Sequence, residues 1–197
     1  MLGDSRPVGE LQIFANCGAT IGKIEARAHI KQRGRNHLME IAMSFRITGL
    51  DPIPFRPLYG LANIELARLG VKRCRVDAKP GFPDRVEMRD AEPGELMLLL
   101  NYVHQPADTP YKASHAIFVR EGAERAYVGV DEAPECLRGR MLSLRAFDSS
   151  GLMVDADLAD GRELEAAIER LFANPAATYI HAHYAKRGCY AARIDRA

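Results

Sequence analysis

Residues 177–193 read ATYIHAHYAKRGCYAAR, and this stretch decides the fold because it predicts a β-hairpin carrying two imidazoles and a thiol. Successive side chains of a strand point to opposite faces of a sheet, so Tyr179, His181 and His183 share one face. The apolar residues between them occupy the other face. The segment therefore predicts a strand that presents both histidines on the same side.

The expected connection between the two strands of this hairpin is a three-residue loop over 186–188. Gly188 ends the loop, where a left-handed backbone is needed. This loop pairs Ala185 with Cys189 and puts Cys189 on the histidine face, about 7–8 Å from His183 between backbones. A two-residue loop would instead reverse the parity of the second strand and turn Cys189 to the opposite face.

Imidazole nitrogens and thiolates are the side chains that zinc prefers, and carboxylates also bind it. The sequence predicts a metal site with His181, His183 and Cys189 as ligands and Asp84 as a fourth. Three protein ligands and one water would form an open zinc site that activates the water for hydrolysis. Two alternatives stay open: these side chains are packed and hydrogen-bonded without a metal, or Cys189 is a catalytic nucleophile with His181 or His183 as its base.

Two other segments are candidates for the same site. His104 and His115 flank the loop over 105–111; either they approach each other across a wide hairpin, or they are loop-edge histidines solvated by water. The stiff turn over 79–85 either presents Asp84 and Arg85 to a ligand or only reverses the chain.

Arginine is far more frequent than lysine in this sequence, and its planar group suits carboxylates and phosphates. We expect Arg85, Arg145 and Arg193 to hold a small anionic ligand through paired hydrogen bonds. The alternative is an interaction domain whose arginine-rich sheet face docks an acidic partner, with binding that weakens in salt.

Two main helices are predicted. The first spans 57–69, with Pro57 at its opening position and Gly70 just past its end. The second spans 161–173, where Asp160 is a suitable cap and Leu164 begins an apolar helical stripe.

Most of the remaining chain is β-rich, in runs over 95–103, 116–121, 126–130 and 140–147. The run over 95–103 is apolar on both alternating faces, which indicates a strand covered on two sides. These runs follow one another without intervening helices, so we predict an α+β fold with a largely antiparallel sheet and a C-terminal β-hairpin.

The composition argues against binding to nucleic acid or to a membrane surface. The chain has 197 residues, 47% hydrophobic and 27% charged, with a formal net charge of +1, so no charge excess favours nucleic acid or a membrane surface. The four cysteines are widely spaced and form no Cys-x-x-Cys pair. We expect a cytoplasmic protein.

The first 42 residues differ in character from those that follow, and a strand-like run begins at Met43. We therefore expect 1–42 to be an N-terminal extension, either a non-native start or a poorly ordered segment, and 43–197 to be one globular domain. The apolar stretch over 11–21 is interrupted by polar residues, so no signal peptide is expected.

Several short motifs occur together in one order. They are Pro80-Gly81-Phe82-Pro83-x-Arg85, Ala91-Glu92-Pro93-Gly94-Glu95, Pro110-Tyr111, Ile117-Phe118-Val119-Arg120, Leu144-Arg145-Ala146, and His181-x-His183 with Gly188-Cys189-Tyr190-Ala191-Ala192-Arg193. In this combination the chain resembles a bacterial domain family of unknown function, over about 43–197. The resemblance implies a soluble bacterial single-domain protein and brings no reaction or cofactor. Its pattern often has Cys where this chain has Asp84, which puts in doubt a disulfide mechanism common to the family.

These observations predict a domain that binds a metal, with zinc as the expected ion, or a small anionic ligand, and that has hydrolase-like activity. The interaction domain and the cysteine-nucleophile enzyme are the alternatives.

Overall fold

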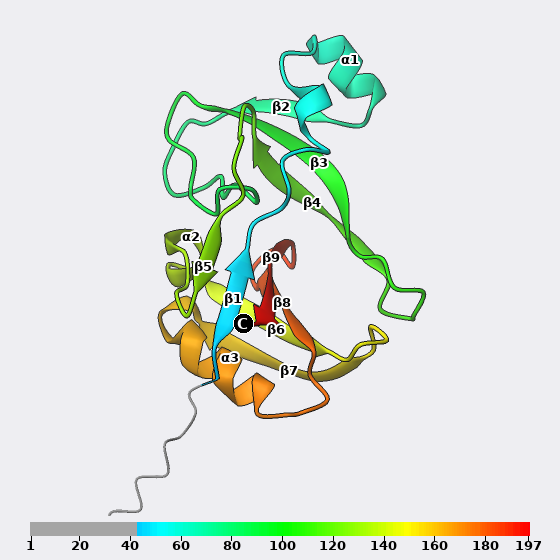
Figure 1. Cartoon of the computed structure of the whole chain (residues 1–197). Helices are drawn as coiled ribbons and strands as arrows, with labels where there is room; N and C mark the ends of the chain where they lie inside the picture. Colours follow the sequence, from blue (N-terminus) through cyan, green and yellow to red (C-terminus); the bar gives the residue numbers. More distant parts are fainter. Residues whose placement is uncertain (1–42) are drawn as a thin grey trace, which may run out of the picture. The chain divides into compact units, whose positions relative to one another are not determined.

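The computed structural model of the chain describes residues 43–197, which form two antiparallel sheets and several short helices (Figure 1). The larger sheet has the strand order β5-β1-β9-β8-β6-β7, and the smaller sheet has the order β2-β3-β4. The strands are β1 (Phe45–Thr48), β2 (Lys72–Arg75), β3 (Leu96–Gln105), β4 (Ala113–Arg120), β5 (Val128–Val130), β6 (Met141–Phe147), β7 (Met153–Asp160), β8 (Tyr179–Tyr184) and β9 (Tyr190–Arg196). The helical segments are η1 (Arg56–Leu58), α1 (Asn63–Arg68), α2 (Glu135–Arg138), η2 (Gly161–Glu163) and α3 (Leu164–Phe172).

This architecture confirms the predicted α+β class with antiparallel pairing and a C-terminal hairpin, β8–β9. Two sheets are present where the sequence analysis expected one. The predicted extension over 1–42 lies outside the described residues. Within 43–197, no helix combines the length and the apolar character that crossing a membrane requires.

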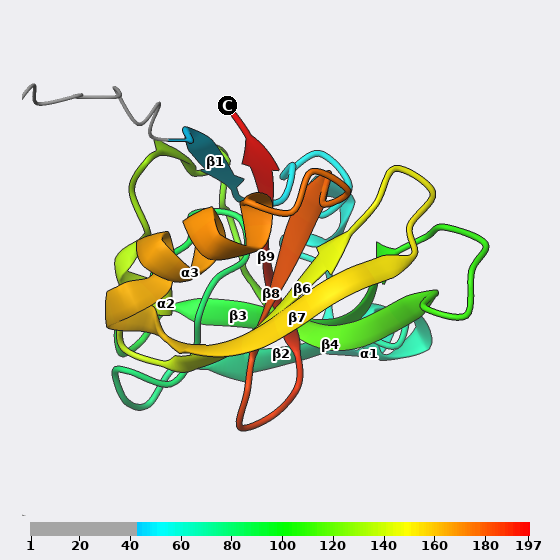
Figure 2. The same ribbon diagram turned by 90° about the horizontal axis from the view of Figure 1, so that it is seen from below.

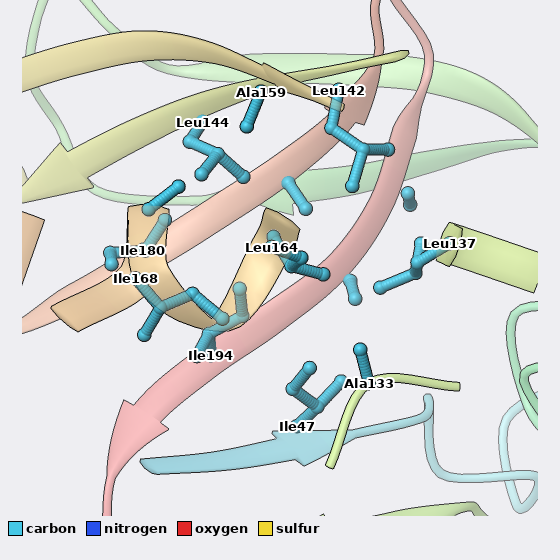
Figure 3. Packing of buried hydrophobic residues seen from close by; sticks show 14 of the residues in the cluster. Ile47, Ala133, Leu137, Leu142, Leu144, Ala159, Leu164, Ile168, Ile180 and Ile194 are labelled. Carbon is cyan, nitrogen blue, oxygen red and sulfur yellow. The ribbon is translucent and has the colours of Figure 1, made fainter. Parts of the chain in front are cut away.

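The main core lies between α3 and one face of the larger sheet. Leu164 and Ile168 of α3 pack toward Leu142, Ile180 and Ile194 of the sheet strands, as Figure 3 shows. The predicted helix over 161–173 is present as η2 followed by α3, which together cover 161–172, and the Asp160 carboxylate accepts a hydrogen bond at its start. The amphipathic pattern of this segment was therefore a reliable signal.

The predicted helix over 57–69 is interrupted. It consists of the short turn η1 and the separate helix α1. Between them Gly60 has a φ of 76°, a left-handed conformation that an α-helix does not accommodate. The pattern of Pro57 and Gly70 marked the two ends of this region and missed the break inside it.

The smaller sheet covers the other face of the larger one, as the view from below shows (Figure 2). Leu98 and Leu100 of β3 lie in a second apolar cluster that includes Tyr190 of β9. Met97, on the opposite face of β3, is buried against Val76. Strand β3 is thus covered on both sides, as its sequence predicted.

Candidate functional site

One polar region lies on the larger-sheet face that looks toward the smaller sheet. Within this face, His181 of β8 lies directly opposite Arg145 of β6 and Arg193 of β9, and His183 lies opposite Ser143. Directly opposed residues of neighbouring strands share a face. The two histidines therefore project from the same side, as their spacing predicted.

The hairpin β8–β9 contains a β-bulge that changes the expected position of Cys189. Ala182 pairs with Ala192 but His183 pairs with Tyr190, so Ala191 is the extra residue. The Tyr184 amide donates to the Cys189 carbonyl at 3.0 Å, which makes the loop one residue longer than predicted. Tyr190 thus takes the place opposite His183, and Cys189 packs against the core on the other face of the sheet.

A second β-bulge, in β3, positions His104. Val103 pairs with Ser114 and Gln105 with Ala113, which leaves His104 as the unpaired extra residue. Bulges redirect side chains and are common beside functional sites. His104 is buried at 7% exposure although its neighbour Val103 is 51% exposed.

His104 meets His115 of β4, which is one of the two alternatives that the sequence left open for these loop-flanking residues. His104 Nε2 and His115 Nδ1 are 2.8 Å apart, and the two rings are stacked with centroids 4.8 Å apart. The ring of His183 lies edge-on to both, at 5.0 Å from His104 and 5.4 Å from His115. One nitrogen from each of these three histidines falls within 4.8 Å of the others.

Several buried ring nitrogens of this cluster and of the neighbouring His181 lack a hydrogen-bond partner among residues 43–197. His183 Nδ1 donates to the Gly188 carbonyl at 3.0 Å, because a carbonyl oxygen can only accept. This bond places the proton on Nδ1 and leaves a free electron pair on His183 Nε2, which has no partner. His104 Nδ1 and His181 Nδ1 are also buried without partners. Metal-binding histidines are commonly oriented by a hydrogen bond from the other ring nitrogen to a carbonyl.

The surroundings keep these imidazoles uncharged at neutral pH. Burial, followed by the charges of neighbouring side chains such as Arg145, lowers the pKa of His183 from 6.5 to about 3. Burial likewise lowers the pKa of His181 to about 3 and that of His104 to about 4. The pKa of His115 is lowered by burial and by Arg145. The neutral imidazole is the form that binds metals.

A cleft of about 420 Å³ adjoins the histidines. His104 and His181 contribute to its wall, together with Tyr102, Tyr190 and Arg193. The Tyr190 ring stacks on His104 with centroids 4.9 Å apart. Tyr102 and Tyr190 are site residues that the sequence did not indicate. Tyr190 stands opposite His183 because the next residue, Ala191, forms the bulge, and the sequence carries no signal for this bulge.

Asp84 and Cys189 lie outside the group of imidazoles, and Arg85 contacts Cys189. The Asp84 carboxylate is buried, which raises its pKa, and it accepts hydrogen bonds from the backbone amides of Glu87 and Arg120. Arg85 is 1% exposed and donates to the Tyr190 carbonyl at 3.0 Å and to Cys189 Sγ at 3.4 Å. These contacts hold the turn over 79–85 against the hairpin, and they do not bring Asp84 or Cys189 into the cluster of imidazoles.

The remaining predicted arginines, Arg145 and Arg193, flank His181 on its two neighbouring strands. The Arg193 guanidinium pairs with Asp195 and lies over the Tyr179 ring, 3.9 Å from its centroid. Arg145 is half-buried and belongs to the histidine face. The structure thus gives Arg85 a buried structural role, whereas Arg145 and Arg193 both lie beside His181 and only Arg193 of these two is paired with a carboxylate.

Three comparisons bear on this site. A family model described as "Protein of unknown function (DUF1203)" matches residues 81–196, a range that contains every histidine of the cluster. No curated protein and no solved structure matches the chain.

Proposed function

The chain belongs to the DUF1203 family of proteins of unknown function, and from the chemistry of its site we propose that it is a metal-binding protein with hydrolase-like activity. The ligands in this proposal are His104, His115 and His183. The observation that carries it is the convergence of three neutral imidazoles, with one nitrogen from each within 4.8 Å, around the unpartnered His183 Nε2. Buried polar atoms without a partner are uncommon in folded proteins, and a bound ion would satisfy His183 Nε2.

Zinc is the expected ion, because imidazole is a good ligand for it and His115 and His183 come from rigid strands. Closing three nitrogens around one zinc at bond lengths near 2.0–2.1 Å requires ring shifts on the order of 1 Å. Three protein ligands leave a fourth position for water, whose pKa falls to about 7 on zinc. Such a water is a nucleophile at neutral pH, which is the basis of the proposed hydrolysis.

This proposal revises the ligand set expected from the sequence, which was His181, His183, Cys189 and Asp84. His183 remains a ligand, and His104 and His115 take the places of Cys189 and Asp84. His181 lies beside the cluster, with its ring centroid 5.4 Å from that of His104, and lines the cleft where a substrate would reach the metal.

The two alternative functions draw less support. Cys189 has the Arg85 guanidinium as its polar neighbour and packs on the face of the sheet opposite His183, so no imidazole of this cluster is placed to act as its base. The arginine-rich surface is largely neutralised within the chain, since Arg73 pairs with Glu121 and Arg120 pairs with Glu87. A face with paired charges attracts an acidic partner weakly.

We also propose that residues 43–197 form a single domain of a cytoplasmic bacterial protein. Residues 41–197 group into one unit by their contacts, and Cys74, Cys136 and Cys189 are free thiols, as a reducing compartment favours. Limited proteolysis followed by mass spectrometry tests the domain boundary: a stable fragment that begins well inside 43–197 contradicts a single domain over this range.

Metal analysis of the full chain, purified without a histidine tag, tests the metal site. We expect about one zinc per chain by calorimetric titration of the EDTA-treated protein, and loss of high-affinity binding in His183→Ala, His104→Ala and His115→Ala. Cys189→Ser should bind zinc as the wild type does. The double variant His29→Ala/His37→Ala, which changes histidines outside the described residues, is the matched control and should also retain binding.

The proposed activity is tested separately with p-nitrophenyl acetate and p-nitrophenyl phosphate as probes of ester hydrolysis. Hydrolysis that appears with zinc, disappears with EDTA and is absent in His183→Ala supports it. Wild-type protein that binds no zinc overturns the metal site, and zinc binding without hydrolysis of either ester overturns the hydrolase-like activity.

A further inference from the structure

Arg145 is a charged residue of the larger sheet that lies beside the histidines. It lies in β6 directly opposite His181 and two residues from Ser143, which is opposite His183. Its guanidinium is therefore on the face that the cluster occupies. Its positive charge contributes to lowering the pKa of His104, His115, His181 and His183.

No residue among 43–197 forms an ion pair or hydrogen bond with the Arg145 guanidinium. The other two candidate arginines differ in this respect: Arg85 donates to the Tyr190 carbonyl, and Arg193 pairs with Asp195. A half-buried guanidinium ordinarily has a carboxylate or carbonyl partner, because leaving a charged group partly desolvated and unpaired is unfavourable. The five donors of Arg145 are thus available to a molecule that is not part of the described chain.

The positive charge of the site indicates which kind of molecule the Arg145 guanidinium binds. A divalent ion held by neutral imidazoles keeps its full positive charge, and Arg145 adds another beside it. The three ligands of the proposed ion site are all histidines, and no carboxylate belongs to this group. A metal ligand that is itself negative would neutralise both charges at once, and a planar guanidinium binds carboxylates and phosphates through two parallel hydrogen bonds.

Resting on the proposed metal site, we propose that Arg145 binds a small oxyanion, a carboxylate or a phosphate, that also occupies the open position of the metal. The substrate class is then a compact carboxylic or phosphoric acid derivative that enters by the cleft lined by His181 and Tyr190. Arg145 contacts the substrate in this arrangement and does not contribute to holding the metal.

Cobalt-loaded protein provides the test, because the visible spectrum of cobalt reports what occupies its open position. We expect sodium acetate or inorganic phosphate to shift the spectrum of the wild type, and the stronger of the two identifies the ligand class. Arg145→Gln should bind cobalt as the wild type does, but the same spectral shift should need an anion concentration about tenfold higher or more. This difference corresponds to the loss of one charge-assisted hydrogen-bonding group. Arg145→Lys keeps the charge without the planar geometry and should be intermediate.

Arg162→Gln is the matched control, since Arg162 is exposed in η2 and pairs with Asp160, and the anion affinity of this variant should equal that of the wild type. Failure of the wild type to bind cobalt overturns the metal site on which this inference rests. Normal cobalt binding with equal anion affinity in the wild type and Arg145→Gln, or with no spectral response to either anion, overturns the role of Arg145 alone.

Discussion

The buried histidines of the site stay uncharged at a pH at which exposed histidines become protonated. His104, His181 and His183 are buried at 7%, 2% and 0% exposure, and burial is the first cause of their lowered pKa values. An imidazole that is neutral in the folded state at a pH of about 6.5 is half protonated in the unfolded chain at the same pH. The residues that suit a metal site therefore also make stability depend on pH.

We predict that the EDTA-treated protein loses stability on mild acidification. Below pH 6.5 the unfolded chain binds protons that the folded chain binds only near pH 3–4, so this stability is complete above pH 6.5 and is lost toward pH 3–4. Each buried imidazole should contribute a loss of about 1 kcal/mol between pH 7.5 and 5.5. Urea denaturation at the two pH values measures it.

His181→Phe isolates the contribution of one imidazole to this pH dependence. The substituted ring keeps aromatic neighbours, since Phe147 and Tyr179 both have ring centroids 5.1 Å from His181. The variant should lose about 1 kcal/mol less than the wild type over the same pH interval. Phe147→Leu, which removes packing without changing a titrating group, should be destabilised equally at both pH values. An unchanged pH dependence in His181→Phe contradicts the prediction.

Individual residues were predictable from the sequence where local spacing decides their position. The shared face of His181 and His183 follows from strand alternation. The places of His104 and His115 at the two ends of one loop allowed their contact but did not decide it, because solvated side chains were the alternative. The face of Cys189 depends on whether one extra residue is inserted in β9. A one-residue difference reverses the face, and the packing of the whole hairpin decides it.

At the scale of elements, the loop of the hairpin β8–β9 connects the backbone to the cluster. Gly188 has a φ of 73°, and its carbonyl accepts the hydrogen bond that orients His183. The predicted left-handed glycine is present, although the loop is longer than expected. Gly188 thus permits the left-handed turn, and its carbonyl fixes the tautomer of His183, a proposed metal ligand.

We predict that Gly188→Ala lowers the free energy of unfolding by about 1–2 kcal/mol. A Cβ at this position would meet no atom within 4 Å, so the cost comes from the left-handed backbone and not from a clash. Gly188→Asn should cost less, because asparagine tolerates this conformation better. Chemical denaturation with EDTA present measures both variants, and equal losses in the two would contradict the conformational explanation.

The helices illustrate which elements a sequence predicts well. The segment of η2 and α3 has a capping Asp160 and a continuous apolar stripe, and it was placed to within a residue or two. The region of η1 and α1 has helix signals at both ends, but Gly60 divides it. Strand β7 was not predicted, because the three aspartates in its interior and at its end, in the run MVDADLAD, are typical of an exposed edge and not of a core strand.

At the scale of the whole molecule, the proposed metal joins the two sheets. His104 and His115 belong to the smaller sheet, and His183 belongs to the larger one. The sequence predicted most of the strand runs but not their division between two sheets, because partner choice involves residues far apart, as in the pairing of Phe45 with Arg196. For the same reason the cross-sheet ligand set could not be assembled from spacing alone.

We predict that zinc stabilises the fold as a link between sheets. Free zinc at a hundredfold excess over its dissociation constant should raise the free energy of unfolding by about 2.7 kcal/mol, since the unfolded chain does not hold the site together. Hydrogen exchange should slow in β3, β4 and β8 on zinc addition. Thermal unfolding and exchange mass spectrometry measure the two effects.

His183→Ala should show neither effect, whereas Cys189→Ser should show both. Zinc that stabilises His183→Ala as much as the wild type, or that protects only one of the two sheets, would contradict a link between them.

The position of β9 also affects how the protein is made. This strand, over 190–196, lies between β1 and β8, although β1 begins at residue 45. During translation the larger sheet therefore stays divided until β9 has left the ribosome. Until then β1 and β8 each lack the strand that pairs with them on that side, and their apolar side chains remain partly uncovered. Until that moment the nascent chain is a natural client for chaperones, and closure of this sheet is an event that follows synthesis of its central strand.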